Sequence, residues 1–222
     1  MISVAIDGPA GAGKSTIARA AAEKLGFIYV DTGALYRAIG LNCIKNNVDI
    51  NDPAKVAAIL PDTEIRVVFF NGEQRVLLGG DDVSEEIRSE KASMTASVVS
   101  AIPEVRKFLL DLQRSFAKVN SVIMDGRDIG TVVLPNASVK IFLTASPQSR
   151  AERRVNQLRE KGLEADYETI LKDIMIRDEN DTNRSIAPLK PAEDSVLLDT
   201  TKLTLQQSIE SVISIIKEAA AL

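Results

Sequence analysis

Residues 8–15 decide the fold, because they read Gly-Pro-Ala-Gly-Ala-Gly-Lys-Ser and match the pattern Gly-x-x-x-x-Gly-Lys-Ser/Thr. An apolar run at residues 2–6 comes before them, and residues 14–25 follow with apolar side chains at helical spacing. The sequence therefore predicts a strand, a glycine-rich loop and a helix. Loop amides and a helix N-terminus attract phosphate oxygens. The alternative is a turn that only closes the strand onto the helix.

This loop predicts a nucleotide site with bound magnesium. Lys14 is expected to reach the phosphate that is transferred, and Ser15 is expected to bind Mg²⁺. Phosphoryl transfer also needs a carboxylate on the metal side, and Asp125 follows the apolar run 121–124 at a suitable place. The alternative for Asp125 is a carboxylate that caps the next turn. The residues expected to bind the donor are Gly8, Pro9, Ala10, Gly11, Ala12, Gly13, Lys14, Ser15 and Thr16.

The rest of the chain alternates apolar runs with segments of helical spacing. This alternation predicts an α/β fold, a doubly wound parallel sheet with helices on both faces. Residues 64–70 and 74–78 differ, because they are strand-like and flank Asn71-Gly72, a hairpin signal, so they predict a small antiparallel insert. Other strands are expected at 27–30, 121–124, 139–143 and 196–198, and helices at 34–44, 54–60, 147–162 and 166–183, after 85, from 103 and from 204.

Composition excludes several kinds of site. The 222 residues include no histidine, which rules out an imidazole base, a Ser-His-Asp triad and a histidine-bound metal. Cys43 is the only cysteine, so no internal disulfide forms, and with no export signal in view we expect a cytoplasmic protein. A net charge of -4 argues against broad nucleic-acid binding. No apolar run approaches the ~20 residues that cross a membrane.

Three further segments carry a resemblance to a known family. Residues 31–37 read Asp-Thr-Gly-Ala-Leu-Tyr-Arg, residues 125–130 read Asp-Gly-Arg-Asp-Ile-Gly, and residues 177–184 begin Arg-Asp and end in arginine. Together with the glycine-rich loop they resemble the bacterial cytidylate kinases, nucleoside monophosphate kinases with a P-loop NTPase fold. The resemblance covers nearly the whole chain. It implies an enzyme that transfers the γ-phosphate of ATP to CMP or dCMP, with Mg²⁺, in pyrimidine nucleotide metabolism.

The same resemblance implies three structural units in one monomer. Residues 1–60, 100–150 and 186–222 would form the P-loop core domain. Residues 61–99 would form the insert that binds CMP, and residues 151–185 a helical lid. The expected partners are the nucleotides ATP, CMP and dCMP, with no nucleic acid and no membrane.

Acceptor phosphate contacts are also implied by the resemblance. Arg37 and Arg127 would hold the phosphate of CMP through bidentate contacts, and Thr32 would add a hydroxyl. The alternative for the arginines is surface salt bridging. Some relatives have glycine where this chain has Ser15, so its magnesium role comes from the general loop pattern alone. Thr32 keeps the family's hydroxyl and adds a methyl group.

The base and lid contacts complete the expected site. Asp128, Arg106 and Ser97 would contact cytosine, whose amino group and ring acceptors need a carboxylate and a cationic donor. The alternative for Arg106 and Ser97 is an exposed position on a helix. The resemblance places the lid contacts at Arg177, Asp181 and Arg184, and the catalytic residues at Lys14, Arg127, Arg177 and Arg184.

The lid residues also have a simpler interpretation. On a helix, Arg177, Asp181 and Arg184 share one face, which is the pattern of a solvated charged surface as well. Arg150, Arg153 and Arg154 on the preceding helix receive no firm role. Two other functions stay open: a P-loop kinase for UMP, AMP or shikimate, and a nucleotide-dependent switch without turnover.

Overall fold

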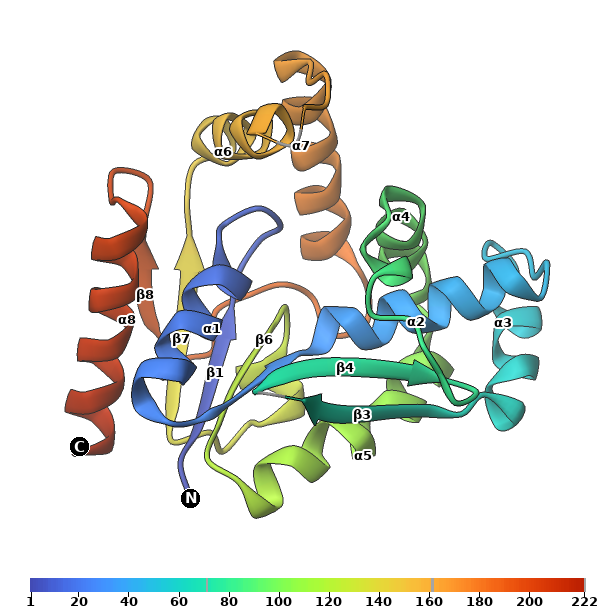
Figure 1. Ribbon diagram of the computed structural model, residues 1–222, viewed down its shortest axis with the longest axis horizontal. Coiled ribbons are helices and arrows are strands. Elements are labelled where there is room, and N and C mark those ends of the chain that lie inside the picture. The colour runs from blue at the N-terminus through green and yellow to red at the C-terminus, as the bar shows by residue number, and fades with distance from the viewer. Residues whose placement is uncertain (71, 161, 222) are drawn as a thin grey trace.

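A parallel sheet forms the centre of the computed structural model, which describes residues 1–70, 72–160 and 162–221 (Figure 1). Its strand order is β2-β6-β1-β7-β8, and every neighbouring pair is parallel. The chain runs from β1 to β2 on one side and later to β7 on the other, so the order reverses beside β1. A ligand crevice is expected at the C-terminal end of such a strand. The strands are β1 (Ser3–Asp7), β2 (Ile28–Asp31), β6 (Val122–Gly126), β7 (Val139–Thr144) and β8 (Val196–Asp199).

Helices cover both faces of this sheet, as predicted. Side chains alternate along β1, so that Val4 and Ile6 pack with α1 (Lys14–Leu25) and α8 (Leu205–Ala220). Ala5 points to the opposite face, where α5 (Pro103–Val119) contributes Leu110 and Phe116. The central strand is therefore buried on both faces, which fixes the position of the loop that follows it.

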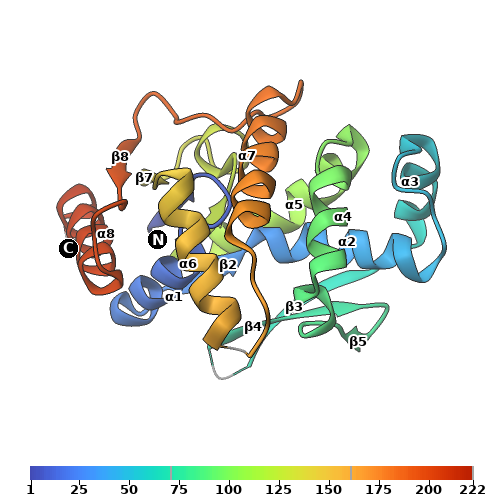
Figure 2. The same cartoon turned by 90° about the horizontal axis from the view of Figure 1, so that it is seen from above.

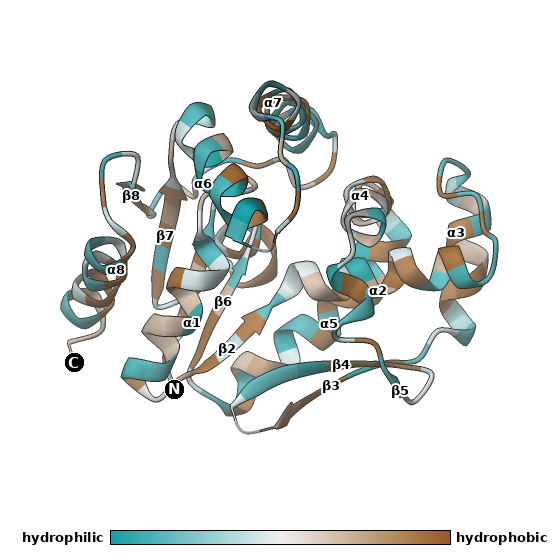
Figure 3. Ribbon diagram, turned by 45° about the horizontal axis from the view of Figure 1, so that its top comes forward, coloured by the Kyte–Doolittle hydropathy of each residue, from teal (hydrophilic) through white to brown (hydrophobic). Residues whose placement is uncertain are grey.

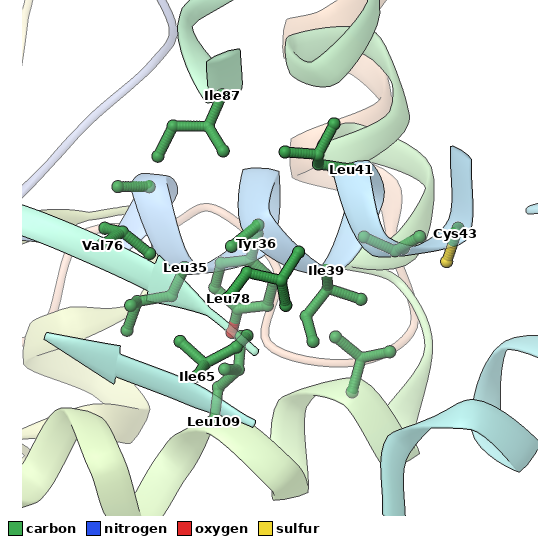
Figure 4. Packing of buried hydrophobic residues seen from close by; sticks show 14 of the residues in the cluster. Leu35, Tyr36, Ile39, Leu41, Cys43, Ile65, Val76, Leu78, Ile87 and Leu109 are labelled. Atoms are coloured by element: carbon green, nitrogen blue, oxygen red, sulfur yellow. The ribbon is translucent and has the colours of Figure 1, made fainter. Parts of the chain in front are cut away.

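A second hydrophobic core surrounds α2 (Thr32–Lys45). Figure 4 shows Leu35 and Ile39 of α2 pointing toward Ile65 and Leu78 of the antiparallel hairpin and toward Leu109 of α5. The hairpin confirms the predicted insert, although Asn71 of its turn lies outside the described residues. This part of the chain comprises α3 (Pro53–Ile59), η1 (Leu60–Asp62), β3 (Ile65–Phe70), β4 (Glu73–Leu78), β5 (Asp81–Asp82), η2 (Glu86–Arg88) and α4 (Glu90–Val99).

Two helices lie above the C-terminal ends of the strands. Figure 2 shows α6 (Pro147–Glu160) beside α7 (Tyr167–Asn183), and these two helices contact each other. Figure 3 shows that α6 is mostly hydrophilic, whereas β7, which leads into it, is hydrophobic. Among the helices of the described ranges, none has both the length and the apolar character needed to cross a bilayer.

Local signals explain where several helices begin. The predicted start of α2 at residue 34 is two residues late, because the Asp31 side chain accepts the Ala34 N–H at 3.0 Å and caps the helix earlier. Thr204 and Gln207 form the predicted capping box at the start of α8. The wide helical turn η3 (Ile129–Val133) was not predicted.

Candidate active site

The glycine-rich loop leaves β1 at the C-terminal edge of the sheet and enters α1 (Figure 1). Gly11 and Gly13 have φ angles of 74° and 90°, in the left-handed region that other residues rarely adopt. Gly8 is required for space, since a Cβ there would lie 1.9 Å from the carbonyl oxygen of Leu143 on β7. These glycines let the backbone turn tightly into the N-terminus of α1, the kind of loop that binds phosphate.

Lys14 is buried at the base of this loop, with 5% of its surface exposed. Its Nζ donates to the carbonyl oxygens of Gly8 and Pro9, both at 2.8 Å. Burial, and then the positive charge of Arg127, lowers the pKa of Lys14 to about 7. The lysine of the donor loop and an arginine expected on the acceptor side therefore share one electrostatic environment.

Ser15 and Asp125 lie within hydrogen-bond distance, since the Ser15 Oγ donates to the Asp125 Oδ2 at 2.8 Å. The hydroxyl of Tyr29 donates to the other carboxylate oxygen at 3.0 Å. Burial, and then the charge of Asp31, raises the pKa of Asp125 to about 6. Within the described residues this carboxylate accepts no backbone N–H, so the turn-capping alternative is wrong. Hydroxyl and carboxylate oxygens fit Mg²⁺.

Sequence reasoning missed Tyr29. Its only signal is a hydroxyl on the short and otherwise apolar start of β2. Tyr29 is 6% exposed, and burial, followed by the charge of Asp125, raises the pKa of its phenol well above the ordinary value. Tyr29 therefore stays protonated and donates its hydrogen to Asp125.

Arg37 and Thr32 lie in the first turns of α2, at the same edge of the sheet. Arg37 pairs with Asp31, with 2.7 Å between Nη2 and Oδ2, while its buried Nε has no hydrogen-bond partner among the described atoms. Thr32 donates its hydroxyl to the main-chain oxygen of Asp125 at 2.8 Å. A buried donor without a partner is costly, and an anionic oxygen of a ligand would satisfy it.

Arg127 and Arg177 bring two further positive charges to this edge. Arg127 follows β6, and its Nε donates to the Asp181 Oδ2 of α7 at 2.8 Å. Burial, and then the charge of Arg127, lowers the pKa of Arg177, with Arg37 adding to the effect. Arginines from α2, from the end of β6 and from α7 are thus gathered in one place, although they lie up to 140 residues apart in the chain (Arg37 to Arg177).

Asp128 and Arg106 form a buried ion pair, being 4% and 9% exposed. Arg106 also donates to the Ser100 carbonyl oxygen at 3.0 Å, and its guanidinium lies 5.6 Å from the centre of the Tyr36 ring. The alternative in which Arg106 is an exposed helical residue is therefore wrong. Ser97 is half-buried on α4, and within the described residues its hydroxyl makes no hydrogen bond with this pair.

Arg184 corrects one expectation. The helix α7 ends one residue earlier and Arg184 is extended, with φ -62° and ψ 141°, so it does not share a helix face with Arg177. The chain turns back here, and the Leu189 N–H donates to the Asp181 carbonyl oxygen at 2.8 Å. The Arg184 side chain is still only 7% exposed, with its Nη2 3.7 Å from Asp128. A solvated surface is therefore excluded for this arginine.

The three arginines of α6 that had no assigned role differ in what they contact. Arg150 is 2% exposed, donates to the Ala10 carbonyl oxygen in the glycine-rich loop at 2.9 Å, and pairs with Asp178 of α7. Arg153 also reaches the loop through a main-chain oxygen. Among the described residues, Arg154 bonds only to a neighbouring side chain, on the exposed side of α6. Arg150 thus connects the loop with α7, a link that no local sequence pattern signals.

Comparison with known proteins agrees with this geometry. A cytidylate kinase from Caldicellulosiruptor saccharolyticus is 51% identical over 214 residues, covering 96% of this chain and 95% of that protein. One from Pasteurella multocida is 45% identical over 217 residues, covering 98% and 96%. Among solved structures, a gluconokinase from Sinorhizobium meliloti superposes with a TM-score of 0.52 at 14% identity, over 99% of this chain and 94% of that one.

That structural likeness shows the fold alone, a kinase fold built on the same layers. The sequence comparison goes further, because the family model described as cytidylate kinase matches residues 4–218, from β1 to the last turns of α8. The match includes the glycine-rich loop, the hairpin, the arginine cluster and the two helices above the sheet. The chain therefore belongs to the cytidylate kinase family.

Proposed function

We propose that this chain transfers the γ-phosphate of ATP to CMP or dCMP, producing ADP and CDP or dCDP. Two kinds of support combine: relatives that cover nearly the whole chain are named cytidylate kinase, and a donor loop lies beside a separate arginine cluster. The observation that carries the proposal is the buried Asp128–Arg106 pair at that cluster. A pocket that only bound phosphate would not need a buried carboxylate.

The donor side of the reaction would use the glycine-rich loop. Its amides and Lys14 would hold the β- and γ-phosphates of ATP. Ser15 and Asp125, whose oxygens are 2.8 Å apart, would hold Mg²⁺. When bound, this ion would neutralise part of the phosphate charge. Tyr29 would fix the orientation of the Asp125 carboxylate through its hydrogen bond.

The acceptor phosphate would bind at Arg37 and Arg127, with Thr32 beside it. A monophosphate already carries an anionic oxygen, so the attack needs alignment and charge neutralisation rather than a general base. A new P–O bond would form as the bond between the γ-phosphorus and the ADP oxygen breaks. Arg177 and Arg184 would stabilise the negative charge on the phosphoryl group in the transition state. Asp181 would contact a sugar hydroxyl of the nucleotide.

The base would be read at Asp128 and Arg106, with Ser97 as a further contact. Cytosine offers an amino donor to the carboxylate, and ring acceptors to the guanidinium. Uracil reverses both, placing an oxygen against Asp128 and an N–H against Arg106. Carboxylate oxygens have further lone pairs when one is engaged with an arginine, so the pair keeps capacity for a base.

We also propose that the chain consists of three structural units with different functions. Residues 1–60, 100–150 and 186–222 form the P-loop core, 61–99 the CMP-binding insert and 151–185 the lid. One hydrophobic cluster joins α2 and α5 of the core to the hairpin and α4 of the insert, so the insert would be anchored to the core through α2. Closure of α6 and α7 over the loop would exclude water and suppress ATP hydrolysis.

A single assay tests the proposed function. Purified enzyme with Mg²⁺ and ATP is given CMP, dCMP, UMP, AMP or shikimate, and ADP release is followed by a coupled reaction. We expect rapid turnover with CMP and dCMP, and little above the ATP-only background with the other three. Turnover confined to UMP, AMP or shikimate would name a different kinase, and background rates with all five would leave a nucleotide-dependent switch.

A further inference from the structure

Asp7 is the last residue of β1 and stands directly before the glycine-rich loop. It is 4% exposed, and both of its carboxylate oxygens are used on a distant turn. Oδ1 accepts the Ile129 N–H and Oδ2 accepts the Gly130 N–H, each at 2.7 Å. One carboxylate therefore joins the start of the donor loop to the two residues that follow Asp128.

The turn that Asp7 holds has an unusual backbone. The Leu134 N–H donates to the Ile129 carbonyl oxygen at 2.7 Å, and the Val133 N–H donates to that of Asp128 at 3.1 Å, each five residues apart. Such wide turns are rare and often occur at functional sites. The first N–H groups of any helical segment lack partners within it, and here Asp7 supplies the acceptors.

Gly130 is matched to this carboxylate. A Cβ at that position would lie 3.3 Å from the Asp7 Oδ2 and 3.2 Å from the Lys140 Cδ, closer than ordinary packing. Glycine thus lets the backbone approach the carboxylate without displacing it. Asparagine could not replace Asp7 equally, since an amide offers one oxygen acceptor and would turn its own N–H toward the second amide.

We propose that Asp7 is a positioning residue. It fixes Asp128, and with it the Asp128–Arg106 pair that recognises the acceptor base, relative to the donor loop. Asp7 is itself held in β1, which pairs with β6 and β7, so loss of the contact would free the turn at Ile129 and Gly130 while the loop keeps its place. The inference rests on the proposed function for its kinetic consequence. The contact itself is independent of that function, so the two can fail separately.

The test compares wild type with Asp7→Asn in steady-state kinetics. We expect KM for CMP to rise about tenfold and the preference for CMP over UMP in kcat/KM to fall about tenfold, the effect of losing one charge-assisted hydrogen bond. KM for ATP should stay within about twofold, because the loop amides and Lys14 are unchanged. A purely structural role would instead lower stability and leave the CMP-to-UMP ratio as it is. An unchanged ratio, or equal rises in both KM values, would overturn the proposal.

Two additions keep the test decisive. If Asp7→Asn does not fold, Gly130→Ala displaces the same carboxylate. It should lower the ratio of kcat/KM for CMP to that for UMP by about threefold. An unchanged ratio would refute the positioning role of Asp7. Amide NMR of Ile129 and Gly130 should show faster hydrogen exchange in either variant. If the wild-type enzyme phosphorylates no CMP, the proposed function is wrong. If hydrogen exchange at these two amides is unaltered in the variants, the positioning role of Asp7 is wrong instead.

Discussion

Buried charges dominate this site at the scale of single residues. Lys14, Asp125, Asp128 and the Arg184 side chain are each less than a tenth exposed. Burying charged groups costs free energy unless partners satisfy them. The Arg37 Nε and the Arg184 Nη2 are buried without a hydrogen-bond partner among the described atoms. The protein therefore maintains an arrangement that favours an anionic ligand.

Asp128→Asn tests whether the Asp128 carboxylate recognises the acceptor base. The amide can donate to an oxygen of uracil, so the ratio of kcat/KM for CMP to that for UMP should fall about tenfold. Parallel kinetics with both nucleotides measure the ratio. Asp52→Asn is a suitable control, because Asp52 also pairs with a cation, the Lys55 Nζ at 3.2 Å, but does so at the start of α3. A ratio that Asp128→Asn leaves unchanged would remove this residue from base recognition.

Arg184→Ala should lower kcat about a hundredfold, as expected when a charge that stabilises the transition state is lost. KM for ATP should change less than about threefold, since the donor loop is untouched. Arg154→Ala provides the matched control, because within the part of the chain that the structure describes this arginine bonds only to Gln157, on the exposed side of α6. Equal and small effects of the two substitutions would show that Arg184 takes no part in transfer.

The stability contributed by Asp7 should depend on pH. Burial raises the pKa of this carboxyl from 3.8 to about 6. The folded state then binds more protons than the unfolded state between these values, so the group lowers the free energy of unfolding as the pH rises from about 4 to about 6. Relative to Asp7→Asn, wild type should lose about 3 kcal/mol between pH 4 and about 7. Denaturant unfolding at both pH values measures this; a constant difference would contradict it.

At the scale of elements, local chemistry separates what the sequence predicts from what it does not. The capping box at Thr204 and Gln207 is complete within four residues, so the start of α8 was predictable. The wide turn η3 depends on Asp7, more than a hundred residues away, so no local pattern indicates it. The end of α7 at Asn183 agrees with the prediction, but the turn that carries Arg184 away from the helix face was missed, because it is closed by a bond from Leu189 to Asp181.

The contact between the loop and α7 is an element-scale prediction. Arg150 holds both Ala10 and Asp178, so Asp178→Asn should release α7 while leaving the sheet intact. We expect amide hydrogen exchange in residues 167–183 to accelerate about tenfold, with no change in β1. Asp173→Asn, an exposed position on the same helix, should exchange like wild type. Unchanged exchange in Asp178→Asn would exclude this pair as a lid contact.

At the scale of the whole molecule, topology assembles the site. The order β2-β6-β1-β7-β8 places the ends of β1, β2 and β6 side by side, so the glycine-rich loop, Asp31 and Asp125 meet at one edge. Short motifs predicted the residues at that edge, because each motif is contiguous. Their partners Tyr29, Arg150 and Asp7 were not predictable, since each contact joins segments that only the folded chain brings together.

The central claim is that the glycine-rich loop and the arginine cluster hold two phosphates for one direct, in-line transfer. The most direct test uses ATP made chiral at the γ-phosphorus with oxygen isotopes, CMP as acceptor, and analysis of the configuration in the CDP formed. A single in-line displacement inverts the configuration at phosphorus, and inversion is the predicted result. Retention would require a phosphorylated enzyme intermediate and would contradict the account.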